Sequence, residues 1–183
     1  MKNAIILHGT DGYPGENWFM WLKKELEKRG YEIWLPQLPN CNKPDVDTYN
    51  KFLLSKDFNF NDETILIGHS SGAVEILSLL NNLPNKTKIK RAILVAGFID
   101  NLDWDALDGL FKKDFDYDDI KSKVGEIILM HSDNDPYVPL EHGEKLAKLL
   151  NAKLIIKKGQ KHFSVGSYGE KYTKFPFLLE LID

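Results

Sequence analysis

Short apolar runs recur along the chain and alternate with segments of helical periodicity. Six runs are rich in aliphatic and β-branched residues, and most are unbroken; they cover residues 4–7, 31–35, 64–67, 92–96, 126–130 and 153–156. Unbroken apolar runs are typical of strands buried on both faces, as in a parallel sheet that is covered by helices. The pattern therefore predicts six strands, most of them buried on both faces.

The segments between these runs carry the helical pattern. In residues 17–29, Trp18, Leu22 and Leu26 fall on one side of a helix, and Gly30 follows as a stop signal. Further helices are predicted over residues 47–55, 72–81 and 141–150, and a docking helix over residues 172–182. Such strand–helix units build an open sheet through right-handed crossovers. The predicted fold class is α/β: a mostly parallel sheet of about six strands with helices on both faces.

Residues 98–124 form the longest stretch without a predicted strand. This stretch is rich in Asp and contains Trp104, Phe111, Phe115 and Tyr117. Two interpretations are open: a small cap over an active site, or a solvent-exposed crossover helix. The chain has 183 residues, which fits one domain spanning residues 1–183 and leaves room for a minimal lid or none.

Composition narrows the range of partners. Lys and Arg number 24 against 27 Asp and Glu, which gives a net charge of −3 and no basic surplus for nucleic acid or an anionic membrane. The apolar runs are far shorter than the ~20 residues of a membrane-spanning helix. Cys41 is the only cysteine, so an internal disulfide is excluded. We expect a cytoplasmic protein without nucleic-acid or membrane partners.

Residues 64–74 contain the pattern G-x-S-x-G with Ser70 at its centre. An apolar strand runs into the pattern and an apolar helix runs out of it, which is the setting of a nucleophile elbow. A serine on such a turn adopts a strained backbone, and the chain passes so close that only small residues fit at Gly68 and Gly72. The alternative is a serine that merely caps the helix.

A serine nucleophile needs a base, and the base needs an orienting acid. In this type of fold the acid and then the histidine follow the serine along the chain, each after a strand. His162 is the only histidine after the last predicted strand. The loop before that strand offers two candidates for the acid, Asp133 and Asp135. Pro136 stiffens the turn just after Asp135, which favours Asp135 as the acid but does not exclude Asp133.

The loop after the first strand is the place for an oxyanion hole. In such a hole one backbone N–H donor comes from the residue after the nucleophile, here Ser71, and the second comes from this first loop, where Thr10 is the candidate. Glycines 9, 12 and 15 do not match a phosphate-binding pattern, and no G-K-[ST] or H-E-x-x-H occurs. No cofactor or metal is expected. Apolar walls are expected from residues beside the loops, namely Trp18, Phe98, Tyr137 and Phe163.

These motifs resemble the α/β-hydrolase superfamily, and within it the compact serine hydrolases of the retinoblastoma-binding protein nine type and their bacterial relatives. The resemblance spans essentially the whole chain and is carried by residues 68–72, 18–26, 132–136 and 161–163. It implies a three-layer α/β-hydrolase fold and a triad of Ser70, Asp135 and His162, the acid directly preceding a proline. It also implies hydrolysis of small esters or amides through an acyl-enzyme on Ser70. The alternative is a catalytically silent protein that uses this fold as a protein-binding module.

Overall fold

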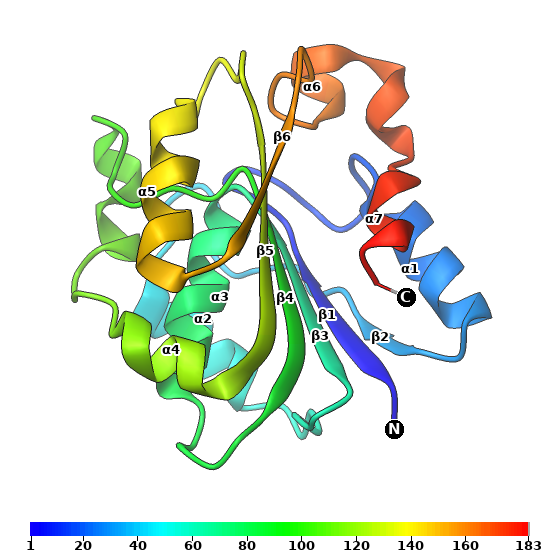
Figure 1. The fold of residues 1–183 in the computed structure, drawn as a ribbon, viewed down its shortest axis with the longest axis vertical. Helices are drawn as coiled ribbons and strands as arrows, with labels where there is room; N and C mark the ends of the chain where they lie inside the picture. Colours follow the sequence, from blue (N-terminus) through cyan, green and yellow to red (C-terminus); the bar gives the residue numbers. More distant parts are fainter. Residues whose placement is uncertain (183) are drawn as a thin grey trace.

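The computed structural model describes residues 1–182 and contains one six-stranded sheet whose strands are all parallel (Figure 1). The spatial order is β2-β1-β3-β4-β5-β6. All six predicted strands are present, with ends that shift by no more than three residues, but the strands at the two edges of the sheet contain no buried residue. They are β1 Asn3–Leu7, β2 Glu32–Trp34, β3 Thr64–His69, β4 Ile89–Val95, β5 Val124–Ser132 and β6 Lys153–Lys157.

Helices cover both faces of this sheet, as the apolar pattern predicts. The helices are α1 Phe19–Lys28, α2 Val46–Leu54, α3 Ser71–Asn82, α4 Tyr117–Lys123, α5 Leu140–Leu150, α6 Val165–Tyr168 and α7 Phe177–Glu180. Two short 3₁₀ helices are η1 Asp105–Leu110 and η2 Glu170–Thr173. Helices α2 to α5 lie on one face, and α1 and α7 lie on the other (Figure 1).

Alternate strand residues supply the two layers of the core. In β1, Ile5 and Leu7 belong to the cluster under α2 to α5, whereas Ala4 and Ile6 belong to the cluster under α1 and the tail. This follows from the two-residue period of side chains along a strand. Because both faces are covered, every residue of β1 is buried, which explains why Ala4 to Leu7 are all apolar.

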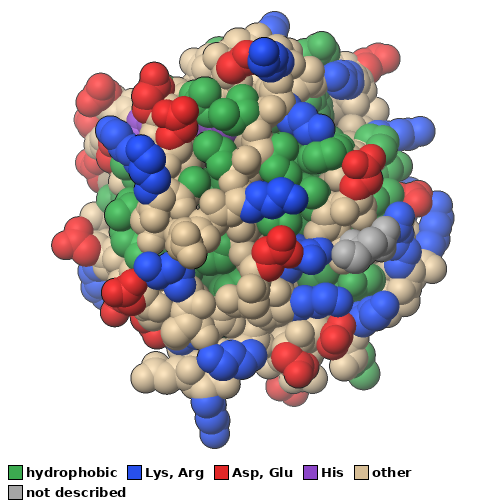
Figure 2. Space-filling view, viewed as in Figure 1, with side chains coloured by type: hydrophobic (Ala, Val, Ile, Leu, Met, Phe, Trp, Pro, Cys, Tyr) green, Lys and Arg blue, Asp and Glu red, His purple; other side chains and the backbone are tan. Residues whose placement is uncertain are grey.

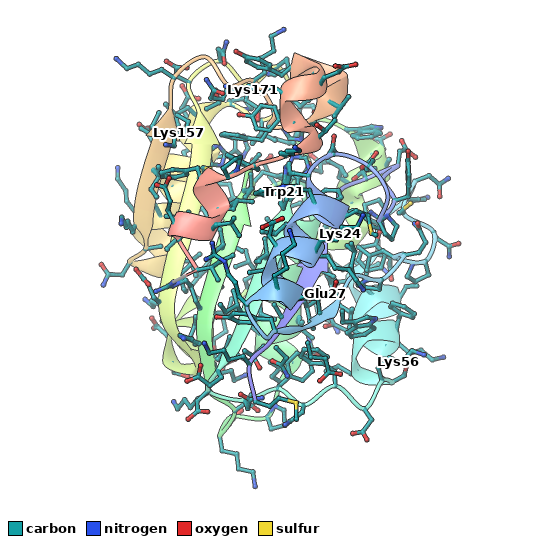
Figure 3. The ribbon with its side chains drawn as sticks, turned by 90° about the vertical axis from the view of Figure 1, so that its right-hand side faces the viewer. Trp21, Lys24, Glu27, Lys56, Lys157 and Lys171 are labelled. Atoms are coloured by element: carbon teal, nitrogen blue, oxygen red, sulfur yellow. The ribbon has the colours of Figure 1, made fainter. Side chains whose placement is uncertain are left out.

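The tail corrects one prediction. A single docking helix over residues 172–182 is wrong, because the segment breaks at Lys174, whose backbone is extended, and restarts as α7 behind Pro176. Proline removes a backbone N–H and disfavours helical geometry in the residue before it. The tail nevertheless docks: Phe175 and Leu178 are buried in the same cluster as α1. Figure 3 shows α1, with Trp21, Lys24 and Glu27 labelled, beside this tail.

Residues 98–124 combine both interpretations offered by the sequence. Helix α4 is a crossover helix between β4 and β5, and its Ile120 is buried in the core under α3. The earlier part contains η1, whose Leu107 and Leu110 belong to a separate small cluster with Phe98. Only this earlier part lies beside the strand ends, so the protein has a wall there rather than a domain-sized lid.

The surface carries both signs of charge. Lys and Arg side chains are interspersed with Asp and Glu on the face seen in Figure 2. No helix within residues 1–182 has both the length and the apolar character needed to cross a bilayer.

Candidate active site

Four loops meet at the carboxyl ends of the parallel strands. They follow β1, β3, β5 and β6, and they carry Thr10, Ser70, Asp135 and His162 respectively. The carboxyl ends of parallel strands share one edge of the sheet, which is where α/β folds bind their ligands. The fold therefore brings the residues predicted from four distant parts of the chain to one place.

Ser70 lies on a strained turn between β3 and α3. Its backbone has φ 56° and ψ −124°, a conformation that L-residues rarely adopt. A Cβ built on Gly68 would lie 2.5 Å from the Gly72 carbonyl oxygen, and one on Gly72 would lie 2.5 Å from the His8 carbonyl oxygen. The predicted need for small residues at these two positions is confirmed. The tight contacts fix the turn and leave Ser70 facing a cavity.

The Asp135 carboxylate is bonded to the His162 ring. His162 Nδ1 lies 2.7 Å from Asp135 Oδ2, while Oδ1 accepts the backbone N–H groups of Tyr137 at 2.9 Å and Val138 at 3.0 Å. The Asp135 side chain is fully buried. Because an ionised carboxylate only accepts, Nδ1 carries the proton and Nε2 is left as an acceptor. Asp133 instead accepts the Gly159 N–H at 2.7 Å and is exposed.

Ser70 and His162 line the same cavity. Among the described residues, no hydrogen bond within 3.5 Å joins their side chains. Long or poorly aligned contacts of this kind are common in unliganded enzymes and tighten when substrate binds. The structure thus brings together the predicted base, acid and nucleophile, while the serine hydroxyl makes no hydrogen bond to the ring.

Thr10 and Ser71 lie side by side next to Ser70. The Thr10 hydroxyl donates to Ser71 Oγ at 2.9 Å, and a Cβ on Gly9 would lie 3.0 Å from Ser70 Cβ. Ser71 opens α3, so its N–H has no partner within the helix. The Thr10 N–H has no hydrogen-bond partner within residues 1–182. The side-chain bond between them, which the sequence did not reveal, joins the two predicted oxyanion donors.

Three further histidines are buried and hold the loops in place. One ring nitrogen of each bonds a backbone carbonyl: His8 to Gly9, His69 to His162 and His131 to Gly97, each at 2.8 Å. Burial lowers the pKa of all three, that of His69 to about 3. They are therefore neutral, and His69 ties the base loop directly to the elbow.

A cavity of about 550 Å³ lies over Ser70, within the usual range of small-molecule sites. Phe98 and Tyr137 line it as predicted, but Trp18 and Phe163 do not. Trp18 is fully buried, donates its indole N–H to the Phe163 carbonyl at 3.0 Å and packs edge-on against Phe175. Both rings belong to the core beneath the tail, which sequence adjacency did not reveal.

No group of three or more His, Cys, Asp or Glu side chains within residues 1–182 is arranged to hold a metal ion. Cys41 is a free, half-buried thiol. Its Sγ lies 3.3 Å from the Gly12 carbonyl oxygen, so it packs against the first loop.

Known proteins resemble this chain along nearly its full length. YdeN of Bacillus subtilis is 27% identical over 99% of the chain and 94% of its own length. The crystal structure of that gene product superposes with a TM-score of 0.92 over 100% of this chain and 97% of its own. Serine hydrolase RBBP9 of Rattus norvegicus is 25% identical over 91% of the chain and 90% of its own length.

A more distant structure shares the fold. Est1E of Butyrivibrio proteoclasticus, solved with ferulic acid, has a TM-score of 0.69 at 17% identity, covering 100% of this chain and 90% of its own. A sequence model of the serine hydrolases matches residues 4–182. The protein therefore belongs to the serine hydrolase family, with an α/β-hydrolase fold.

Proposed function

We propose that the protein hydrolyses small carboxylic esters or amides through an acyl-enzyme on Ser70. The observation that carries the proposal is the buried bond between Asp135 and His162, placed at the cavity that Ser70 enters from its strained turn. Membership of the serine hydrolase family supports hydrolysis. Assignment of the three roles and of the substrate class is our inference.

In the first half-reaction, Ser70 Oγ attacks the carbonyl carbon of the substrate and its proton passes to His162 Nε2. Asp135 holds the proton on Nδ1 and stabilises the imidazolium that forms. The carbonyl oxygen becomes an oxyanion that accepts the N–H groups of Thr10 and Ser71. Collapse breaks the bond to the leaving alcohol or amine, which takes the proton from His162 Nε2.

In the second half-reaction, a water molecule attacks the acyl-enzyme and gives its proton to His162. Collapse releases the carboxylic acid, and the proton returns to Ser70 Oγ. All groups in this cycle come from the chain, so the proposal includes no cofactor or metal. A cytoplasmic location, favoured by the single cysteine, belongs to the same proposal.

Turnover of p-nitrophenyl acetate by wild type, His162→Ala and His142→Ala tests the assignment of the base. We expect wild type and His142→Ala to turn over the ester, since His142 lies on α5 outside the residues that line the cavity. His162→Ala is expected to lose ~10³-fold or more of kcat. Equal activity of all three proteins would contradict the choice of base. Inactivity of wild type would favour a silent, protein-binding role for the fold.

A further inference from the structure

One wall of the cavity is apolar, and it comes from the segment after β4. Phe98, Leu102, Trp104 and Leu107 line the cavity there, joined by Val138 from the loop after β5. The wall formed by the first loop is different, since Thr10, Asp11, Glu16 and Asn17 line it. The cavity therefore offers an apolar surface on one side of the nucleophile and polar groups on another.

The apolar wall is built into the fold. Phe98, Leu107 and Val138 form a buried cluster with Val46 of α2 and Val74 of α3. At the other end of η1, a Cβ on Gly109 would lie 2.4 Å from the Pro44 carbonyl oxygen, so this turn sits directly on the start of α2. An ion pair between Lys112 and Asp45 closes the same contact. Such anchoring makes the segment a fixed wall.

A backbone kink lies within this wall, at Leu102 and Asp103. Leu102 and Asp103 have φ 55° and 56°, two consecutive residues in the left-handed region without a glycine. The side chains of Asp100 and Asn101 accept their N–H groups at 3.0 and 3.2 Å and hold the kink. Trp104 follows directly and remains 48% exposed while lining the cavity. Strain of this kind collects at ligand sites.

The stereochemistry of acyl transfer decides what this wall faces. The tetrahedral carbon has four substituents: Ser70 Oγ, the oxyanion, the leaving group and the acyl chain. The oxyanion points to the N–H groups of the first loop and of Ser71, and the leaving group points to His162 because it takes a proton from Nε2. The acyl chain is left with the rest of the cavity lining, and the segment after β4 together with Val138 supplies the apolar part of that lining.

Building on the proposed function, we infer that the apolar wall formed by Phe98, Leu102, Trp104, Leu107 and Val138 binds the acyl chain and makes the enzyme selective for apolar acyl groups longer than acetyl. Burial of one methylene is worth about a fourfold change in affinity. Two added methylenes, from acetyl to butyryl, are therefore expected to raise kcat/KM about 15-fold.

The test compares p-nitrophenyl acetate with p-nitrophenyl butyrate on wild type and on two wall variants. Trp104→Ala shortens a half-exposed side chain, which protects the fold. Leu102→Asn makes the wall polar while keeping a residue that tolerates a positive φ. Each variant is expected to lower the butyrate-to-acetate ratio of kcat/KM from about 15 to below about 5. Leu149→Ala on α5, 41% exposed and outside the cavity lining, should keep the wild-type ratio.

The outcomes separate this inference from the proposed function. The acyl-chain assignment is overturned if the butyrate-to-acetate ratio of kcat/KM is near one in wild type, or if it is unchanged in both wall variants. Turnover of the acetate ester in that case still supports the proposed hydrolase function. Absence of turnover with both esters, together with no labelling by a fluorophosphonate, overturns the proposed function itself.

Discussion

Replacement of Asp135 by Asn tests the geometry around His162. The carboxylate accepts three hydrogen bonds, from His162 Nδ1 and from the N–H groups of Tyr137 and Val138. An Asn carbonyl oxygen can keep the two backbone bonds, which turns its NH₂ group toward His162. Two donors cannot face each other, so the ring proton moves to Nε2. The ring can then no longer accept the Ser70 proton.

The expected cost is large for activity and small for stability. Inverting the tautomer of a triad histidine lowers kcat by about 10⁴, equivalent to about 5.5 kcal/mol of barrier. The side chain keeps its shape and its backbone bonds, so the melting temperature should stay within about 3 °C of wild type. The assay is p-nitrophenyl acetate turnover, with unfolding followed by circular dichroism.

Asp133→Asn is the matched control. Among the described residues, the one hydrogen bond that this exposed side chain accepts comes from the Gly159 N–H at 2.7 Å, and the Asn oxygen can also accept it. Activity within about threefold of wild type is expected. The reasoning is refuted if Asp135→Asn retains more than a tenth of the wild-type rate, or if Asp133→Asn loses as much.

Three further predictions concern the support of the site. Gly72→Ala places a Cβ 2.5 Å from the His8 carbonyl oxygen, which forces β1 and α3 apart. kcat/KM should fall about 100-fold and the melting temperature should drop. Gly166→Ala is the control: its Cβ would meet no atom within 4 Å apart from its chain neighbours and its own helix backbone, so the melting temperature should not fall. His69→Phe removes the hydrogen bond between the His69 ring and the His162 carbonyl. The free energy of unfolding, measured by urea denaturation, should fall by about 1–3 kcal/mol. An unchanged free energy of unfolding would show that this hydrogen bond is not needed for stability. Glu75 is fully buried on α3, neither carboxylate oxygen has a partner among the described residues, and burial holds its pKa well above the usual range. The unfolded chain therefore releases this proton at a lower pH than the folded chain does, so the free energy of unfolding falls as pH rises above about 4.5. Glu75→Gln should raise the melting temperature at pH 7.5, by about 3–5 °C for each factor of ten by which folding raises the proton affinity of Glu75, and should not raise it at pH 4. An equal difference in melting temperature at both pH values would contradict this prediction.

The inner strands were predictable because both of their faces are buried. Ala4 to Leu7 and Ile65 to Ile67 are apolar without interruption since each strand packs against helices on both faces. The turn at Ser70 was predictable for a related reason: its two glycines report the close approach of backbone on either side. Such constraints act on neighbouring residues, so they can be recognised in the sequence as an apolar run or a pair of glycines.

Other features depend on contacts between segments far apart in the chain, and no local sequence pattern predicts them. Trp18 follows a loop of the site in sequence, yet its ring is buried against Phe175 of the tail, 157 positions away. Asp133 and Asp135 are two residues apart, and their different partners, Gly159 and His162, follow from how two loops meet. Phe98 was predicted to line the cavity, whereas Leu102, whose backbone lies in the left-handed region, was not.

The central claim, that Ser70 forms a covalent acyl-enzyme, is tested most directly by locating an adduct. Wild type is treated with a fluorophosphonate, and the modified peptide is sequenced by mass spectrometry. We expect one adduct per chain, on Ser70 and not on the adjacent Ser71, with no labelling of Ser70→Ala. An unlabelled wild type, an adduct on another residue, or equal labelling of Ser70→Ala would contradict it.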